Sequence, residues 1–407
     1  MKPRIERTAL LLRTRRALAA NPLVALIGPR QSGKTTLARA IAGTRPGATF
    51  DLEDPVSARA LAQPMTALEP LRGLVVIDEV QRDPSLFPVL RVLADRPRTP
   101  ARFLLLGSAS PELARAGAES LAGRVAFVEM GGFDLDEAGA PAWRRLWLRG
   151  GFPRSFLARG DALSATWRAD FIRTFLERDV RNLAGVRTPA AQLRRLWTML
   201  AHHHGQIFNS SEIGRSLGEP HVTVRRHLDV LVGTLMVREL QPWYENLGKR
   251  QVKSPKVYLR DTGILHALLG IERFRGLESH PRLGASWEGF VLDEAIRIAG
   301  ERNAFFWATQ AGAGLDLLLT IGGRRYGVEV KYADAPGMTK SMRVAMTDLG
   351  LERLFVAYPG AQRYALDRAV EVVPVGALCE ALRALLAGRR ARQSPVRRAG
   401  KRSPRRD

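Results

Sequence analysis

The chain has 407 residues, a length that predicts two to four domains rather than one. Its composition is that of a soluble globular protein, and no apolar run reaches the length of a membrane span. A single cysteine, Cys379, excludes an intramolecular disulfide framework and fits a reducing compartment. The first residues lack the apolar core of a signal peptide, so we expect a cytoplasmic protein with no membrane partner.

The sequence is strongly basic, with a formal net charge of +23. Nine Lys and Arg residues between Arg389 and Arg406, offset by Asp407, contribute eight of these charges, so the rest of the chain is basic as well. A basic protein attracts polyanions, and nucleic acid is the expected partner. An Arg-rich composition imposed by a GC-rich genome would give the same charge, so the charge alone does not establish DNA binding.

The first motif with a defined chemistry is a P-loop, which lies between a strand-like run at 23–27 and a helix-forming run at 35–42. Its glycines let the backbone turn so that N–H groups face a phosphate, and the helix N-terminus adds its dipole. Lys34 would reach the β- and γ-phosphates, and Thr35 would offer its hydroxyl to Mg²⁺. The predicted nucleotide-binding residues of this loop are Gly28, Pro29, Arg30, Gln31, Ser32, Gly33, Lys34, Thr35 and Thr36.

A second motif completes the predicted ATP site. A short strand is expected at 48–52, and the apolar run 73–77 predicts a buried parallel strand with Asp78 and Glu79 at its carboxyl end. Asp78 would bind the nucleotide's Mg²⁺ through water, next to Thr35, and Glu79 would orient and polarise the attacking water. The expected cofactors are therefore ATP and Mg²⁺.

Two more strand runs fit the same sheet, at 102–107 and 125–128. The first ends near Ser108 and Ser110; either hydroxyl could sense a γ-phosphate, and Ser110 could equally cap a following helix. Arg124 could contact a γ-phosphate of its own subunit or of a neighbour, or be an ordinary surface arginine. Strands that alternate with helices predict a parallel sheet covered on both faces.

The middle of the chain has two expected parts. Residues 141–205 show aromatic residues at helical spacing, which predicts a packed helical lid or linker. The run His202-His203-His204 does not predict a metal site, because consecutive helical residues point about 100° apart; we expect a polar helix end.

Residues 206–265 follow the order of a winged helix-turn-helix. A capped helix at 210–217 and a second helix from Pro220 precede a hairpin formed by 236–241 and 255–260. A winged helix that binds protein, or a linker domain in an ATPase ring, is the alternative. The residues expected to contact DNA are Arg225, Arg226, Lys249 and Arg250.

A Gly322-Gly323 pair between two strand runs predicts a β-hairpin near the C-terminus. A two-residue loop pairs Ile321 with Arg324 and so places Asp316 opposite Glu329, with Lys331 on the face of Glu329. Two carboxylates and a lysine predict a second, Mg²⁺-dependent site for phosphodiester hydrolysis, which Glu288 would complete. A surface salt-bridge cluster on an edge hairpin is the alternative.

Several of these motifs together resemble the prokaryotic AAA-family ATP-binding proteins that carry a C-terminal domain of unknown function. The resemblance covers residues 5–385. The pattern of Glu288, Asp316 and Glu329-Val-Lys331 is similar to the PD-(D/E)XK nuclease-like fold. The matching segments are 28–36, 77–81, 106–110, 121–124, 256–263 and 287–290.

The expected fold class is α/β. The predicted parts are a P-loop AAA-type ATPase core at 1–140, the helical lid at 141–205, the winged helix-turn-helix at 206–265, a restriction-endonuclease-like α/β domain at 275–385 and a disordered basic tail at 386–407. We expect an enzyme that binds and hydrolyses ATP and couples the nucleotide state to DNA. An ATP-gated, metal-dependent DNA nuclease and a regulatory switch on a protein partner are the alternatives, and a homo-oligomer stays open.

Overall fold

A computed structural model describes residues 5–43, 47–97, 100–108, 121–179, 189–244 and 253–393. The chain divides into two compact units: Met1–Glu239 with Ser254–Phe290, and Leu240–Lys253 with Val291–Asp407. In the described ranges, no helix has both the length and the apolar character that a bilayer crossing requires.

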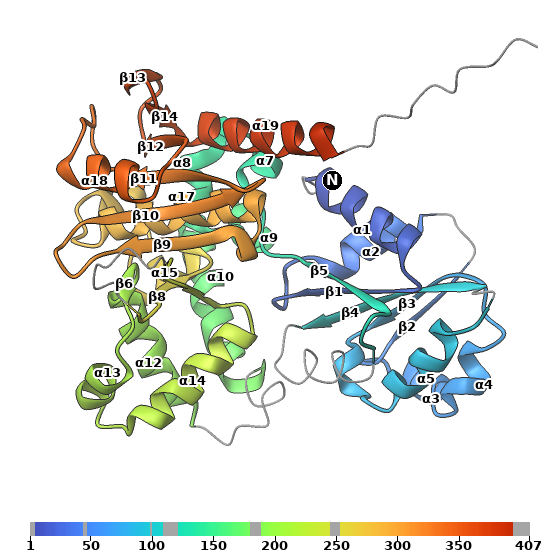
Figure 1. Ribbon diagram of the computed structural model, residues 1–407. Coiled ribbons are helices and arrows are strands. Elements are labelled where there is room, and N and C mark those ends of the chain that lie inside the picture. Colours follow the sequence, from blue (N-terminus) through green and yellow to red (C-terminus); the bar gives the residue numbers. More distant parts are fainter. Residues whose placement is uncertain are drawn as a thin grey trace, which may run out of the picture. The chain divides into compact units, whose positions relative to one another are not determined.

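The first unit begins with a five-stranded parallel sheet (Figure 1). Its strand order is β2-β3-β4-β1-β5, and every neighbouring pair is parallel, as expected from the alternation of strands and helices. All five strands therefore end at one edge. The strands are β1 Leu23–Gly28, β2 Gly47–Asp51, β3 Gly73–Asp78, β4 Ala101–Ser108 and β5 Val125–Glu129.

Helices cover both faces of this sheet (Figure 1). On one face, Leu18 and Ile41 join a core with Leu26 of β1. On the other face, Leu68 and Leu90 join a core with further strand residues. The first face is covered by α1 Thr8–Ala20 and α2 Lys34–Ala42, and the second by α4 Pro64–Leu68 and α5 Leu86–Ala94, with α3 Pro55–Ala60 and the 3-10 turn η1 Val80–Arg82 nearby.

Between the sheet and residue 204, the residues that the structure describes form helices and helical turns and no strand. Their aromatic side chains are buried: Trp147, Phe171 and Trp197 are each at most 2 % exposed, which confirms core packing. The elements are α7 Leu135–Ala138, η2 Ala140–Ala142, α8 Trp143–Arg149, α9 Pro153–Phe156, α10 Asp161–Thr174, the π-helical turn η3 Phe175–Asp179 and α12 Ala190–His202.

Two helices and a small three-stranded sheet come next. The expected helix pair and both hairpin strands are present. The sheet also contains a third strand, β6, which was not predicted because two residues are too few to show a strand periodicity. Asn209 caps the first helix by accepting the N–H groups of Ser211 and Glu212. The order is β6 Gln206–Ile207, α13 Ser210–Leu217, α14 His221–Gly233, β7 Val237–Leu240 and β8 Lys256–Leu259, and the helices α15 Thr262–Leu268, α16 Phe274–Glu278 and α17 Leu283–Ala299 follow.

Asp261, between β8 and α15, fixes this region to the end of α8. One carboxylate oxygen accepts the N–H of Ile264 at 2.9 Å and caps α15, and the other accepts the N–H of Gly151 at 2.8 Å. Gly150 has φ 73°, and a Cβ there would lie 2.1 Å from the Asp261 carboxylate. Only glycine fits this contact.

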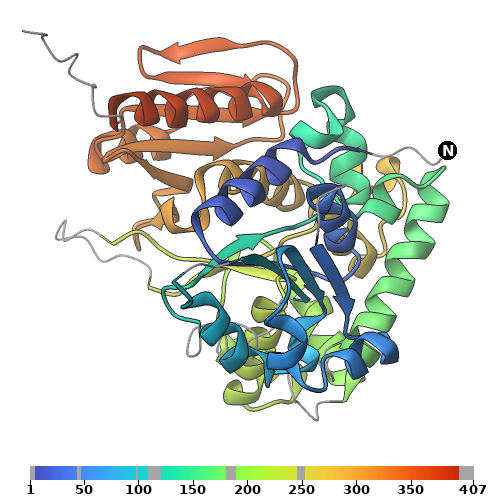
Figure 2. The ribbon, with the colours of Figure 1, turned by 90° about the vertical axis from the view of Figure 1, so that its right-hand side faces the viewer.

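The second unit contains a six-stranded mixed sheet of order β13-β14-β12-β11-β10-β9. Leu318, Leu354 and Met342 belong to the core between one face and α18. Figure 2 shows α19, drawn in red, along the strands of this sheet. The elements are η4 Glu301–Asn303, β9 Ala304–Ala308, β10 Gly314–Ile321, β11 Arg324–Val330, α18 Lys340–Asp348, β12 Arg353–Tyr358, β13 Tyr364–Asp367, β14 Val370–Pro374 and α19 Val375–Gln393.

One predicted boundary differs from the structure. The disordered tail was expected from residue 386, but α19 continues to Gln393. An Ala- and Leu-rich segment at 381–387 has high helix propensity and carries the helix into the basic region. Residues 394–407 lie outside the described ranges.

We predict that Gly263→Ala destabilises the protein by about 2–3 kcal/mol, because the new Cβ would lie 2.1 Å from the carbonyl oxygen of Arg149. Gly284→Ala is the matched control: Gly284 is also the second residue of a helix, and its Cβ would meet nothing within 4 Å. That change should be neutral or stabilise by up to about 1 kcal/mol. Urea denaturation measures both, and equal stabilities would contradict the close contact.

Candidate nucleotide-binding site

The P-loop connects β1 to α2 and is held by close backbone packing. A Cβ on Gly28 would lie 2.1 Å from the carbonyl oxygen of Met130, so no larger residue fits there. Gln31 and Gly33 have φ of 62° and 98°, the left-handed conformations that turn the loop toward the helix N-terminus. The side chains of Met130 and Pro153 lie 3.6 and 3.9 Å from the Cβ position of Gly33.

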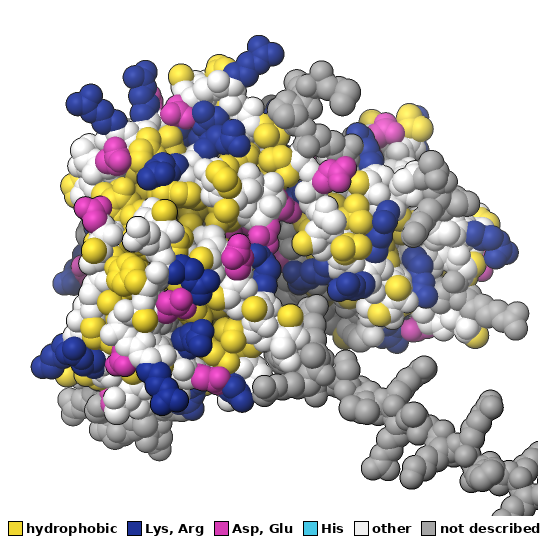
Figure 3. Space-filling view, turned by 90° about the horizontal axis from the view of Figure 1, so that it is seen from above, with side chains coloured by type: hydrophobic (Ala, Val, Ile, Leu, Met, Phe, Trp, Pro, Cys, Tyr) yellow, Lys and Arg dark blue, Asp and Glu magenta, His cyan; other side chains and the backbone are white. Residues whose placement is uncertain are grey.

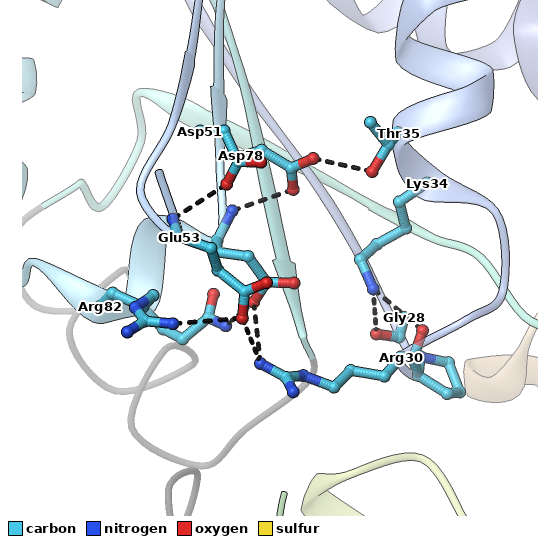
Figure 4. A network of polar contacts seen from close by, with 11 residues as sticks. Gly28, Arg30, Lys34, Thr35, Asp51, Glu53, Asp78 and Arg82 are labelled. Atoms are coloured by element: carbon cyan, nitrogen blue, oxygen red, sulfur yellow. Dashed lines mark hydrogen bonds and ion pairs between the residues drawn. The ribbon is translucent and has the colours of Figure 1, made fainter. Parts of the chain in front are cut away.

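Lys34 is buried at the start of α2, and its ammonium donates to the carbonyl oxygens of Gly28 and Pro29, both at 2.9 Å (Figure 4). The lysine is thus directed into the loop rather than toward solvent. A buried ammonium inside a loop of backbone N–H groups is the arrangement that binds the terminal phosphates of a nucleotide.

Thr35 and Asp78 meet at the same edge, as predicted. The Thr35 hydroxyl donates to Asp78 Oδ2 at 2.7 Å, and the N–H of Glu79 donates to Asp78 Oδ1 at 2.9 Å (Figure 4). Asp78 is 6 % exposed. A hydroxyl and a carboxylate are the hard oxygen donors that Mg²⁺ prefers, so these two residues fit a nucleotide-bound Mg²⁺.

Glu79 lies directly after β3 in a left-handed conformation, with φ 54°. Its Oε2 accepts a short hydrogen bond from the side-chain amide of Gln81 and lies 3.9 Å from Arg30 Nη2. Such a conformation is uncommon for a residue other than glycine and concentrates at functional sites.

Glu53 also belongs to this site, although it is not among the residues predicted from the sequence. Its Oε1 accepts from Arg30 at 2.9 Å and from Arg82 at 3.1 Å. The signal was available: Glu53 follows the predicted strand 48–52, and parallel strands end at one edge.

Ser108 and Arg124 lie at opposite ends of the sheet. Ser108, the last residue of β4, pairs with Gly28 in register; it is buried, and within the described ranges its hydroxyl has no hydrogen-bond partner. Arg124 precedes β5 and pairs with Asp95 at 2.6 Å, so it lies at the amino edge, away from its own P-loop. From this position Arg124 does not reach a nucleotide bound at the P-loop of its own subunit. Contact with the nucleotide of a neighbouring subunit stays a prediction. Ser110 lies outside the described residues.

The structure describes two of the four residues expected to bind DNA, and one of these two, Arg225, is held in ion pairs. Arg225 is paired with Asp229 at 2.7 Å and Glu239 at 2.5 Å, and hydrogen bonding to Glu239 foremost raises the pKa of its guanidinium. Two acidic side chains thus compete with a phosphate for this guanidinium, and DNA contact by Arg225 stays a prediction. Arg226 is exposed on α14. Lys249 and Arg250 lie outside the described residues.

The expectation of a polar helix end at residues 202–204 is wrong for its last residue. His204 is 1 % exposed, and its Nδ1 accepts the N–H of Leu259 at 3.0 Å. Burial lowers the pKa of His204 to about 3, so the ring is neutral. It joins α12 to β8 as a buried structural residue.

The C-terminal hairpin has the predicted register. Ile321 pairs with Arg324 and Leu317 with Val328, one pair short of Asp316 and Glu329. Lys331 Nζ lies 2.7 Å from Glu329 Oε1, and Asp316 Oδ2 accepts the N–H of Val330 at 2.9 Å.

Glu329 is the buried member of this group, at 6 % exposed. Burial, with the nearby Asp316 carboxylate second, raises the pKa of Glu329 to about 7, although Lys331 opposes the shift. Within the described ranges its Oε2 has no hydrogen-bond partner.

Glu288 lies in the first unit, where it accepts from Tyr258 at 2.5 Å and Lys256 at 3.2 Å. Among the described residues, no three His, Cys, Asp or Glu side chains gather as metal ligands. The metal site of Glu288, Asp316, Glu329 and Lys331 therefore stays a prediction.

Two relatives match most of the chain: the uncharacterized proteins Rv2008c of Mycobacterium tuberculosis and Mb2031c of Mycobacterium bovis. Each is 54 % identical over 370 residues, which span 91 % of this chain and 84 % of the relative. The chain belongs to the family of these mycobacterial proteins. Family models match an AAA domain at residues 20–139, a domain of unknown function (DUF8612) at 140–275 and another (DUF4143) at 283–378.

The AAA match confirms the expected AAA-type P-loop ATPase domain in this family. The nuclease-like assignment stays a prediction, because the matching C-terminal model carries no known function. Among solved structures, the Walker-type ATPase PABY2304 of Pyrococcus abyssi is 16 % identical with a TM-score of 0.49, covering 65 % of this chain and 96 % of that one. The RuvB Holliday junction branch migration motor of Thermotoga maritima is 18 % identical with a TM-score of 0.30, covering 58 % and 90 %.

We predict that Glu329→Gln reduces the pH dependence of stability. A carboxyl whose pKa is raised on folding stabilises the protein below its unfolded pKa, and that stability is lost as the pH rises toward 7. In buffer without divalent cations, ionisation of Glu329 should lower the free energy of unfolding of the wild-type protein by about 2 kcal/mol between pH 5 and pH 8. Thermal melting at both pH values should show a smaller change in the variant.

Glu371→Gln is the control for this measurement, because Glu371 lies in the same sheet, paired with Arg363 at 2.9 Å. It should retain the wild-type pH dependence. If the hairpin binds metal, millimolar Mn²⁺ should raise the wild-type melting temperature at pH 8 and leave Glu329→Gln unchanged. An unaltered pH dependence in Glu329→Gln would contradict the raised pKa.

Proposed function

We propose that this protein binds and hydrolyses ATP and couples its nucleotide state to DNA binding. The observation that carries the ATPase part is the meeting of Lys34, Thr35 and Asp78 at one sheet edge, beside Glu79. Lys34 and the loop N–H groups bind the phosphates, and Thr35 and Asp78 would hold Mg²⁺. A Mg²⁺ held there would supply positive charge that offsets the negative charge of the nucleotide's phosphates.

Glu79 is the proposed base. Its carboxylate accepts a hydrogen bond from the attacking water and orients it toward the γ-phosphorus. The left-handed backbone of Glu79 directs this side chain from the strand end into the site. The amide of Gln81 restricts it further.

The proposed DNA element is the part of the chain from β6 to β8, whose order of strand, two helices and two strands is that of a winged helix-turn-helix. The exposed side chains of His221 and Arg226 on α14 support α14 as the recognition helix. On the face that Figure 3 shows, Lys and Arg side chains are interspersed with Asp and Glu side chains rather than gathered in one basic patch.

A continuous set of contacts supports the coupling. Phe133, just after β5, donates its N–H to Gly151 O at 2.6 Å, and Gly151 is bound by Asp261. Arg260 also makes a short ion pair with Glu129, the last residue of β5. A shift at the nucleotide edge would therefore reach β8 and the helices packed on it.

An ATP-gated nuclease is the second candidate, favoured by the buried Glu329 beside Asp316 and Lys331. This arrangement resembles a metal-dependent phosphodiesterase site. This function requires that Glu329 binds a metal, which the melting experiment with Mn²⁺ tests. A switch that acts on a protein partner is the third candidate, favoured if DNA does not bind at low salt.

We predict different effects for two variants of the ATP site. Lys34→Ala removes a phosphate contact and should weaken ATP binding about 10-fold or more. Glu79→Gln retains the shape but loses the base, so ATP should bind with wild-type affinity and turn over about 100-fold more slowly. Binding and single-turnover hydrolysis of ATP measure both effects, and unchanged turnover in Glu79→Gln would exclude Glu79 as the base.

We predict that Arg226→Ala lowers the salt dependence of DNA affinity by about 0.9 in the slope of log K against log salt concentration, the loss of one phosphate contact. The test uses the full chain and a chain that ends at Gln393, which keeps α19 intact. Arg343→Ala, an exposed arginine on α18, is the control and should leave the slope unchanged. DNA binding that disappears in the shortened chain alone would assign it to the C-terminal residues instead of α14.

A further inference from the structure

We propose that Arg30 is a catalytic residue that contacts the γ-phosphoryl group during hydrolysis, and that Glu53 is the residue that positions it. This inference rests on the proposed ATPase activity and adds a second cationic group to Lys34. Arg30 would provide a positive charge to the γ-phosphoryl group from the same subunit, whereas Arg124 lies at the other edge of the sheet.

The position of the Arg30 side chain is the first observation. Arg30 is the third residue of the P-loop, and its side chain extends from the loop toward Glu53 (Figure 4). Its Nη2 lies 2.9 Å from Glu53 Oε1 and 3.9 Å from Glu79 Oε2. The side chain is 28 % exposed, so it lines the site rather than extending into solvent.

The anchoring of Glu53 is the second observation. The N–H of Glu53 donates to Asp51 Oδ1 at 2.9 Å, and Asp51 pairs with Asp78 across β2 and β3. The carboxylate also accepts from Arg82, which follows β3, at 3.1 Å. Glu53 is thus hydrogen-bonded to a residue at the end of β2 and to another that follows β3, and its carboxylate fixes the position of the Arg30 guanidinium.

The chemistry explains why a cation is useful there. The water oxygen forms a bond to the γ-phosphorus, and the bond from that phosphorus to the bridging oxygen breaks, with its electron pair leaving on ADP. The water proton passes to the Glu79 carboxylate and then to the released phosphate. Negative charge on the γ-phosphoryl oxygens must be neutralised throughout this transfer.

Arg30 is suited to that task by its distance from Glu79. A water that donates to Glu79 lies within reach of a guanidinium 3.9 Å from the same carboxylate, so Arg30 is beside the attacking face of the phosphoryl group. A guanidinium presents several N–H donors in a fixed plane and can contact Glu53 and a phosphoryl oxygen together. Lys34, by contrast, donates to the carbonyl oxygen of Gly28 within the P-loop itself.

The experiment compares Arg30→Ala, Arg30→Lys and Glu53→Gln by steady-state ATP hydrolysis and by affinity for ADP with and without aluminium fluoride, which imitates the phosphoryl group in transfer. For Arg30→Ala we expect kcat about 100-fold lower with KM within about 3-fold. Affinity for ADP with aluminium fluoride should fall by a similar factor, and affinity for ADP alone should not change. Arg30→Lys should recover part of the loss.

Glu53→Gln should lower kcat about 10-fold without raising KM, and it should add nothing in the Arg30→Ala background, because its effect passes through Arg30. Arg96→Ala and Glu69→Gln are controls from an ion pair of 2.8 Å in the same domain, outside the site. Both should keep wild-type kinetics.

A kcat in Arg30→Ala that equals or exceeds the wild-type value would overturn the inference and indicate that Arg30 restrains Glu79. Absence of turnover in the wild-type chain would contradict the proposed ATPase activity instead. In that case the aluminium fluoride measurement decides alone: equal affinity in wild-type and Arg30→Ala overturns the role of Arg30.

Discussion

The parallel arrangement of β1 to β4 is the constraint on which the site depends. In a parallel sheet every strand ends at the same edge, so residues far apart in sequence, separated by the crossover helices, meet there. The P-loop, Glu53, Asp78 and Ser108 each follow or end a different strand. The sheet fixes their spacing, and the side-chain contacts at the edge then decide their chemistry.

Backbone packing at glycine connects this edge to the rest of the first unit. Gly28 approaches the carbonyl of Met130 and Gly132 approaches Gly151, backbone against backbone, and Gly150 faces the Asp261 carboxylate. Contacts between backbones transmit small displacements more directly than contacts between flexible side chains, because no rotamer change can absorb them. The helices α13 and α14 therefore share one packed body with the P-loop, which is what nucleotide-dependent DNA binding would require.

The features that the sequence predicted correctly depend on local chemistry. The P-loop geometry follows from the order of Gly28, Gly33 and Lys34, and the hairpin register follows from Gly322 and Gly323, because a two-residue turn leaves one pairing for the strands. The features that it missed depend on partners distant in sequence. Nothing near Arg225 indicates Glu239 as its partner, and the burial of His204 depends on β8. Arg124 was a candidate by residue type, yet its distance from the P-loop depends on strand direction.

The turn between β10 and β11 also limits how this hairpin can change in related proteins. Gly322 and Gly323 both have positive φ, at 66° and 80°, so the turn closes in two residues. From Leu317 to Ile321 the register of β10 with β11 is regular, so side chains there alternate between the two faces of the sheet, whereas the pairing of β10 with β9 shifts between Leu315 and Leu318. Substitutions along the strands leave that alternation intact, whereas insertion of one residue at the turn exchanges the faces of all residues on one strand. Whether the number of residues between the paired Leu317 and Val328 is odd or even therefore decides which face each side chain of the hairpin occupies, independently of the side chains themselves.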